Sequence, residues 1–314
     1  MSSSASSFTG SSSDCTTGTP VSSDSPIREN IAAAVRRVRE TTPLAQSFTN
    51  FVTINLVANA QLAAGGTAAM SFLPDDVIET AKIAGANYIN VGTLLPFYKD
   101  ALPEIAQRLN YLDEPWVLDP VAAGIGRTRT SILQAFKAAP PTVIRANASE
   151  VIALANMWGL NTESVGDASE HRPAGVESVD DVDSATGAAV ALARYLTEQH
   201  AKHSSHDASI RCAVAVSGIA DLVTDGETVY RLPGGSSMMT KITGAGCSLG
   251  GVVATYLAVS DPLTAALSAS LLYNRAGEVA DTTSHGPGSF QVAFLDALWN
   301  VTAEQVAESE ILVQ

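Results

Sequence analysis

Short apolar runs alternate with longer, alanine-rich periodic stretches along most of this chain, from Ile27 onward. The alternation is typical of βα units, in which each strand of a mostly parallel sheet is followed by a helix that packs against it. No segment is repeated along the chain. The sequence therefore predicts an α/β fold built around one mostly parallel sheet.

The boundaries of the individual elements follow from the apolar runs and their flanking turn residues. Strands are expected over Ala86–Val91, Trp116–Asp119, Thr142–Ala146, Cys212–Ser217, Leu222–Thr224 and Thr228–Leu232. Helices are expected over Asn55–Ala64, Pro74–Ala84, Ser149–Met157, Ser184–Gln199, Ser248–Val259 and Pro262–Asp281. Asp225-Gly226, between the last two strands, is typical of a tight hairpin turn. We therefore expect antiparallel strands at one edge of the sheet.

The chain has 314 residues, of which 46% are hydrophobic, so it can bury a sizeable core. We interpret residues 27–314 as a single domain. Residues 1–26 are dominated by Ser and Thr and contain no Lys or Arg, which fits neither a signal peptide nor an Arg-rich transit sequence. We expect them to form a disordered tail. Residues 161–183 are acidic, contain Gly and Pro and lack periodicity, which predicts a surface loop or insertion.

Charge and cysteine content exclude several classes of function. The formal net charge is -14 and no local basic patch is visible, so nucleic acid is not an expected partner. No apolar stretch reaches the roughly 18 residues of a membrane span, so no membrane role is expected. Cys15, Cys212 and Cys247 are too few and too scattered for a disulfide framework or a zinc site. We expect a reduced, cytoplasmic protein.

The segment from Lys241 to Cys247 reads Lys-Ile-Thr-Gly-Ala-Gly-Cys and precedes a predicted helix. Two glycines at this point let the backbone turn tightly, so that unpaired amides at the helix start point to one spot. Such a spot binds anions, above all phosphate. An ordinary helix start with a buried cysteine is the alternative that the motif alone leaves open.

Polar residues follow three of the predicted strands, at the edge where ligands bind in an open parallel sheet. Asp119 ends one strand, Asn147 and Glu150 follow the next, and Ser217 ends a third. The two acids are hard oxygen donors that suit magnesium beside nucleotide phosphates, although Asp119 can also serve as a turn former and Glu150 as a first-turn helix charge.

Arg127 and Arg129 lie in a predicted loop soon after Asp119. A guanidinium placed there can grip a polyphosphate with paired hydrogen bonds, and surface solvation explains either arginine equally well.

His200, His203 and His206 are spaced three residues apart, a pattern that a metal site can also show. They follow a predicted helix in a Ser-rich polar stretch and have no Cys or set of acidic ligands nearby. We therefore expect them in a solvated loop.

A series of ordered strings extends these observations over most of the chain, from about Pro43 to the C-terminus. They are Thr49-Asn50-Phe51-Val52, Ala58-Asn59-Ala60-Gln61-Leu62-Ala63-Ala64-Gly65, Ala69-Met70, Asn90-Val91-Gly92-Thr93-Leu94, Asp119-Pro120-Val121, Asn147-Ala148-Ser149-Glu150, Thr243-Gly244-Ala245-Gly246-Cys247 and Gly286-Pro287-Gly288-Ser289-Phe290. In order and spacing the chain resembles the hydroxyethylthiazole kinases, a thiamine-salvage family of the ribokinase-like superfamily. So many ordered matches are far more specific than one glycine motif.

The resemblance implies a ribokinase-like fold with three α/β/α layers, a mostly parallel central sheet and antiparallel edge strands. It also implies ATP-dependent, magnesium-assisted phosphorylation of the hydroxyl of 4-methyl-5-(2-hydroxyethyl)thiazole. By motif matching, the implied site residues are Met70, Gly244 and Asn50 for the substrate, Arg129, Ser217, Gly246 and Asn147 for ATP, Asp119 and Glu150 for the metal, and Cys247 for catalysis. The chain departs from the family at Gln46-Ser47, at Ala122 of the Ala122-Ala123-Gly124 segment and at Ala146, and relatives carry Gly at the last two positions.

Cys247 occupies the position at which related sugar kinases place Asp as the base that takes the hydroxyl proton. Helix-start amides lower the pKa of a thiol, and phosphoryl transfer depends mainly on positioning and charge neutralisation. We therefore expect Cys247 to position the acceptor and to be able to serve as the base, and not to act as a covalent nucleophile.

The resemblance further implies a homotrimer, in which Met70 and the Asn50 region of one chain face the phosphate loop of the next. Two other functions on the same fold are an ATP-dependent dehydratase that repairs hydrated nicotinamide nucleotides and a non-catalytic thiazole or nucleotide sensor. The dehydratases carry Asp where this chain has Cys247. The retained acids and Arg129 argue against a sensor.

Overall fold

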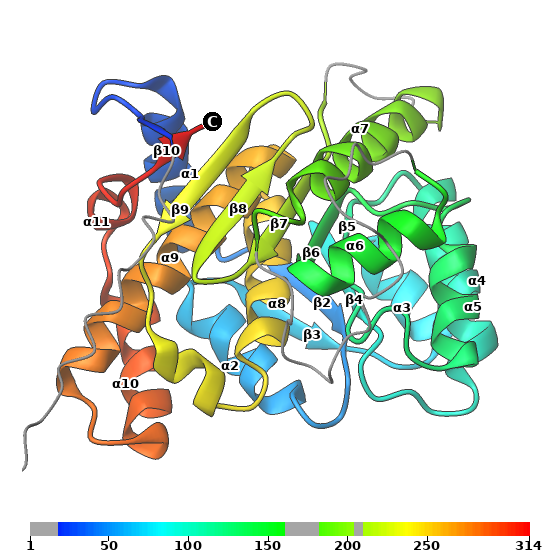
Figure 1. Cartoon of the computed structure of the whole chain (residues 1–314). Coiled ribbons are helices and arrows are strands. Elements are labelled where there is room, and N and C mark those ends of the chain that lie inside the picture. Colours follow the sequence, from blue (N-terminus) through cyan, green and yellow to red (C-terminus); the bar gives the residue numbers. More distant parts are fainter. Residues whose placement is uncertain (1–17, 161–181, 204–209) are drawn as a thin grey trace, which may run out of the picture.

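The structure, a computed structural model, describes residues 18–160, 182–203 and 210–314 of the chain (Figure 1). The predicted tail up to residue 17, most of the predicted loop at 161–183, and His206 lie outside these ranges. Within them the strands form one continuous sheet in the order β1-β10-β9-β8-β7-β6-β5-β4-β2-β3.

Six neighbouring strands of this sheet are parallel, from β3 at the edge to β7. They are β2 (Leu44–Phe48), β3 (Thr67–Met70), β4 (Ala86–Asn90), β5 (Trp116–Asp119), β6 (Val143–Asn147) and β7 (Ala213–Ser217). The remaining strands are antiparallel: β8 (Ala220–Thr224), β9 (Val229–Pro233), β10 (Leu312–Val313) and β1 (Thr19–Pro20). The predicted mostly parallel sheet, its antiparallel edge and the hairpin at Asp225-Gly226 are confirmed.

Helices cover both faces of the sheet and complete the three layers. One face carries α1 (Pro26–Thr41), α2 (Ile54–Ala63), α8 (Ala245–Leu257), α9 (Pro262–Thr283), α10 (Pro287–Asn300) and α11 (Ala303–Ala307). The other carries α3 (Pro74–Ala81), α4 (Tyr98–Tyr111), α5 (Arg127–Ala135), α6 (Ala148–Met157) and α7 (Thr186–His203). Successive strand residues alternate between the two cores: Tyr88 packs with the first set and Ile89 with the second. A short 3₁₀ helix, η1 (Ser237–Lys241), precedes α8.

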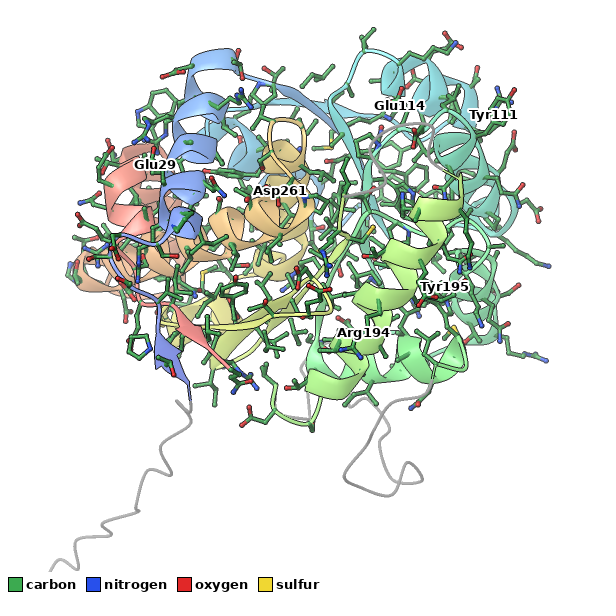
Figure 2. The ribbon with its side chains drawn as sticks, turned by 90° about the horizontal axis from the view of Figure 1, so that it is seen from above. Glu29, Tyr111, Glu114, Arg194, Tyr195 and Asp261 are labelled. Atoms are coloured by element: carbon green, nitrogen blue, oxygen red, sulfur yellow. The ribbon has the colours of Figure 1, made fainter. Side chains whose placement is uncertain are left out.

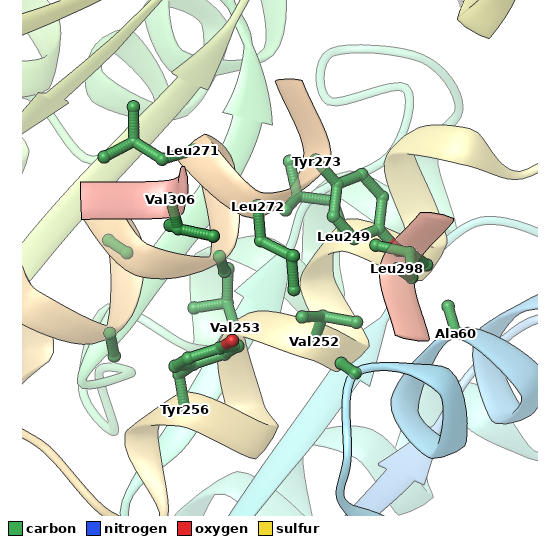
Figure 3. Packing of buried hydrophobic residues seen from close by; sticks show 14 of the residues in the cluster. Ala60, Leu249, Val252, Val253, Tyr256, Leu271, Leu272, Tyr273, Leu298 and Val306 are labelled. Atoms are coloured by element: carbon green, nitrogen blue, oxygen red, sulfur yellow. The ribbon is translucent and has the colours of Figure 1, made fainter. Parts of the chain in front are cut away.

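The α8 and α9 helices form the centre of the first layer (Figure 3). Val252, Val253 and Tyr256 of α8 pack with Leu272 of α9 in one apolar cluster, and nearly all of α8 is buried. The small residues of α8 permit this close packing, as the composition of the segment predicts. The glycine motif predicted to bind phosphate therefore lies at the start of an almost entirely buried helix.

On the opposite face α7 is fixed by polar contacts with segments distant in sequence. Figure 2 shows Arg194 and Tyr195 on this helix. Arg194 Nε donates to the carbonyl of Gly226, and the Tyr195 hydroxyl donates to the carbonyl of Lys137 at 2.8 Å. Among the described residues no helix has the length and apolar character needed to cross a bilayer.

The N-terminal segment departs from the prediction. Thr19 and Pro20 pair with Val313 and Leu312, and Val21 donates to the carbonyl of Ile311 at 2.8 Å. Regular structure therefore begins before residue 27, because part of the segment predicted as a disordered tail forms an edge strand that pairs with the C-terminal strand β10.

Two further local predictions are wrong. Arg127 and Arg129 belong to the first turn of α5 and not to a loop, since Gly126, with φ of 78°, turns the chain directly into the helix. His200 and His203 belong to the last turn of α7 and not to a solvated loop, and His200 Nε2 lies 3.1 Å from the Pro141 carbonyl. The helix continues past its predicted end at Gln199 to His203.

Candidate active site

The start of α8 has the geometry of an anion-binding site. Gly244 precedes the helix with φ of 91°, a left-handed conformation that favours glycine, and no side chain caps the helix. The first helical bond runs from Ser248 N to the Gly244 carbonyl at 2.8 Å, so the amides of residues 245–247 have no partner within the helix. The helix begins at Ala245, so Cys247 is the third residue of its first turn.

Pairing of the parallel strands brings the predicted polar residues to one edge. Asn90 is in register with Asp119, and Asn147 is in register with Ser217. Met70 ends β3 at the same edge and is partly buried against the first core. Sheet register thus places these candidates at the carboxyl ends of the parallel strands, the edge at which ligands bind in such sheets.

Asp119 is fully buried, and its two carboxylate oxygens differ. Its Oδ2 accepts hydrogen bonds from the Tyr88 hydroxyl and from Asn90 Nδ2, both at 3.0 Å. Its Oδ1 has no hydrogen-bond partner. Burial raises the pKa of Asp119, and the charge of Arg145 and these two hydrogen bonds oppose the rise. A buried carboxylate oxygen without a partner is costly unless a ligand satisfies it.

Arg145 is the main site residue that sequence reasoning missed. It is buried in the middle of β6, donates from Nη2 to Ser217 Oγ at 2.7 Å, and places Nη1 3.7 Å from Asp119 Oδ2. A β-carbon on Gly246 would lie 2.6 Å from Nη1, so the guanidinium lies directly against the helix start. Burial lowers the pKa of Arg145, but Asp119 and Glu150 raise it by more, so the group stays charged. An arginine inside an otherwise apolar strand was the available signal.

Glu150 and Asn147 form a capping box at the start of α6. Asn147 Oδ1 accepts from Glu150 N at 2.9 Å, while Glu150 accepts from Asn147 N at 3.0 Å and from Ala122 N at 2.8 Å. Burial, followed by the charge of Asp119, raises the pKa of Glu150 to about 7, against the effect of the two amide hydrogen bonds. Glu150 thus fixes the loop after β5 as well as the start of its own helix.

Cys247 is not the activated thiol that its helix position predicts. Burial and then the negative charge of Asp119 raise its pKa to about 11, and nearby Arg145 only partly offsets them. The expectation of a lowered pKa is wrong because desolvation outweighs the helix amides. Asn50 Nδ2 lies 3.6 Å from Cys247 Sγ and also donates to Asn90 Oδ1 at 2.9 Å. This Asn50 contact is made within one chain, whereas the resemblance implied a contact between chains.

Arg129 is held by backbone carbonyls. Its Nε donates to Val91 O at 3.0 Å, Nη1 to Ile125 O at 2.9 Å and Nη2 to Gly92 O at 2.5 Å. Burial lowers its pKa, and the charge of Glu150 opposes that change. The guanidinium of Arg129 therefore fixes the segments after β4 and β5, whereas that of Arg145 lies against the start of α8.

The residues present fit a magnesium ion that arrives with nucleotide phosphates. Within the described ranges no group of three or more His, Cys, Asp or Glu side chains could hold a metal ion by itself. The unpartnered Oδ1 of Asp119 nevertheless offers a hard oxygen ligand near the helix start. Magnesium usually retains water and substrate oxygens as ligands, so a complete protein cage is not required.

A three-layer α/β fold with an uncapped, glycine-bent helix start and buried acids at the carboxyl edge of its sheet is a fold of the ribokinase-like class. A ribokinase-like superfamily protein from Enterococcus faecalis V583 shares this fold, with a TM-score of 0.50 at 15% identity over 90% of this chain and 91% of that chain. At this identity the likeness concerns the fold alone.

The family itself follows from closer relatives. The profile of the hydroxyethylthiazole kinase family matches residues 35–304, and the chain belongs to this family. It is 94% identical to a hydroxyethylthiazole kinase from Bifidobacterium longum (strain DJO10A) over the full length of both chains. It is also similar to the structure of a hydroxyethylthiazole kinase protein from Pyrococcus horikoshii OT3, with a TM-score of 0.76 and 28% identity, covering 91% of this chain and 99% of that chain. The chain is thus an enzyme, a kinase.

Proposed function

We propose that the enzyme phosphorylates the hydroxyl of 4-methyl-5-(2-hydroxyethyl)thiazole with ATP, giving the thiazole phosphate ester and ADP in thiamine salvage. The observation that carries the phosphoryl-transfer part is the contact of the Arg145 guanidinium with Gly246 at the uncapped start of α8. The family match and the name of the 94% identical relative support the identity of the acceptor.

In the proposed mechanism the chain binds, orients and neutralises charge. The amides of residues 245–247 and the guanidinium of Arg145 stabilise the negative oxygens of the group in transfer. Ser217 orients Arg145, and Asn147 caps α6 and so fixes Glu150, which holds the loop after β5 beside ATP. A magnesium ion, held by Asp119 and Glu150, would supply charge neutralisation at the phosphates.

The acceptor alcohol would lie beside Cys247 and Asn50, with Met70 against the thiazole ring. Because the thiol is protonated at neutral pH, Cys247 acts mainly by position, and Asn50 fixes the sulfur from one side. A loose transition state needs little proton abstraction before the phosphoryl group has moved, which suits a weak base. Arg129 contributes by fixing the ATP-side loops through its carbonyl contacts.

We further propose a homotrimeric, cytoplasmic enzyme whose residues 27–314 work as one kinase domain. The continuous sheet supports one domain. Exposed apolar side chains near edge strand β3, among them Val52 and Leu73 at 66% and 61% exposure, support a subunit interface there. Light scattering and sedimentation test this assembly, and a stable, fully active monomer would contradict it.

The function is tested by ADP release coupled to acceptor phosphorylation. We expect ADP release only with the thiazole alcohol, and phosphorus NMR should identify the phosphate ester. The matched control is 4,5-dimethylthiazole, which lacks the hydroxyl and should give no ADP above background. ADP release with a hydrated nicotinamide nucleotide instead would favour the dehydratase, and ligand binding without turnover would favour the sensor.

A further inference from the structure

Tyr88 places a polar group in the middle of an apolar core. It lies on β4, is fully buried, and packs with the cluster that contains α8. Its hydroxyl accepts from Asn90 Nδ2 at 2.9 Å and donates to Asp119 Oδ2 at 3.0 Å. Tyr256 and Tyr273 in the same cluster are also buried, but their hydroxyl groups have no hydrogen-bond partner among the described residues. The Tyr88 hydroxyl is thus distinguished by what it contacts.

These contacts fix one side of the Asp119 carboxylate. Oδ2 receives the Tyr88 hydroxyl and the Asn90 amide and faces Arg145, while Oδ1 receives nothing. Since a carboxylate rotates about one bond, anchoring Oδ2 from two directions also sets the direction of Oδ1. The anchoring donors come from β4, next to the β5 strand that carries Asp119.

The helix that carries the phosphate-binding motif rests on the same side chains. A β-carbon on Gly250 would meet Tyr88 at 2.4 Å from Cε2 and 2.8 Å from the hydroxyl oxygen. One turn earlier, a β-carbon on Gly246 would meet Arg145. Residues four apart share one face of a helix, so this face of α8 lies over both side chains that approach Asp119 Oδ2. Gly250 provides the space for the Tyr88 ring.

We propose that Tyr88 is a positioning residue that, held beneath Gly250, orients Asp119 so that its free oxygen faces the ligand at the α8 start. The hydroxyl of Tyr88 is satisfied by Asn90 and Asp119, so Tyr88 acts through Asp119. The activity part of this inference rests on the proposed function, whereas its effect on nucleotide binding does not.

The test compares Tyr88→Phe with the wild type. The phenylalanine keeps the ring and its packing but removes the donor, so the thermal midpoint should change little. We expect kcat to fall about tenfold and KM for the thiazole alcohol to change by less than about threefold. The affinity for MgADP, measured by calorimetry, should fall about fivefold because Asp119 is no longer fixed. Tyr256→Phe is the matched control, since it removes a buried hydroxyl from the same core, and all of these quantities should stay unchanged.

A double-mutant cycle with Asp119→Asn shows whether Tyr88 acts through Asp119. Tyr88→Phe should weaken MgADP binding in the wild type and have no further effect in Asp119→Asn. Gly250→Ala, which keeps the hydroxyl but displaces the ring, should lower kcat as Tyr88→Phe does.

Two results would overturn the proposal: wild-type kcat in a folded Tyr88→Phe enzyme, or an equal loss of MgADP affinity in both backgrounds. Absence of wild-type turnover with the thiazole alcohol would refute the proposed function alone, because the MgADP cycle still tests Tyr88.

Discussion

Arg145 of β6 and Gly246 of α8 are in contact, with no room for a β-carbon between the guanidinium and the helix backbone. The contact joins a buried cation to unpaired helix amides, two groups that attract the same anion. Oδ2 of Asp119 lies 3.7 Å from Arg145 Nη1. The carboxylate therefore balances the charge of the guanidinium, but it is too far from Nη1 to accept a hydrogen bond.

This geometry predicts that Arg145 is more important than Arg129 for ATP. We expect Arg145→Lys to lower kcat/KM for ATP by about a hundredfold, because a lysine cannot reproduce the guanidinium that meets both Ser217 and the helix start. Arg129→Ala should lower activity by about tenfold, through the loops whose carbonyls it holds. Steady-state kinetics with varied ATP decides the ranking, and a larger loss for Arg129→Ala would reverse it.

Substitutions at Cys247 should separate a positioning role from a base. Because the pKa of the thiol is raised to about 11, the group is neutral at pH 7, and Cys247→Ser should retain kcat within about tenfold. Cys247→Asp should keep or raise kcat, since a carboxylate is the more readily ionised base. Complete loss of turnover in folded Cys247→Asp would rule out a base-like role at this position.

Asp119→Ala should lower activity by at least about tenfold and raise the magnesium concentration needed for half-maximal rate. Among the described carboxylates of the site, only that of Asp119 has a buried oxygen without a hydrogen-bond partner, and the substitution removes this oxygen. Asp76→Ala, on the exposed surface of α3, is the control and should leave both values unchanged. An unchanged magnesium requirement in Asp119→Ala would remove Asp119 from the metal site.

Asp221 should make stability depend on pH. Its carboxylate accepts from Gly218 N at 3.0 Å, and burial raises its pKa to about 6, against the effect of that hydrogen bond and of Arg145. A raised pKa means that the folded state binds the proton more tightly, so this stabilisation is present below about pH 4 and is lost as pH rises through about 6.

Asp221→Asn keeps an oxygen for the Gly218 amide and removes the titration. Relative to wild type, it should gain about 2–3 kcal/mol of unfolding free energy between pH 4 and pH 7. Urea unfolding at both pH values measures this change, with Asp296→Asn on the exposed side of α10 as control. A parallel pH dependence in Asp221→Asn and wild type would show that Asp221 does not contribute.

Ala122→Gly should stabilise the protein by about 1 kcal/mol. Ala122 has φ of 58°, a left-handed conformation that costs a residue with a β-carbon, and its amide donates to Glu150. Glycine adopts this conformation without that cost, so the substitution keeps the shape of the loop and removes the strain. Calorimetry should show a rise in the thermal midpoint, whereas a decrease would mean that loop entropy outweighs the strain.

Local pattern was sufficient for much of the fold. Continuous apolar runs such as Trp116–Asp119 specified strands, and turn chemistry at Asp225-Gly226 specified the hairpin, because both depend on neighbouring residues. Short elements such as β1 and β10 were missed because pairing between the two ends of the chain, and not propensity, makes them strands.

The sequence by itself determined the order of strands β4 to β9 and of helices α2, α3, α6, α7, α8 and α9, the glycine-bent start of α8 and the acids that follow the strands, since each is written in adjacent residues. Only the tertiary structure decided that Arg145 meets Gly246, that Asp119 keeps one oxygen free and that the Cys247 thiol stays protonated. Those properties depend on burial and on charges brought together from β4, β5, β6 and α8. Desolvation and Coulomb energies follow distance in space, and no local reading of the chain contains that distance.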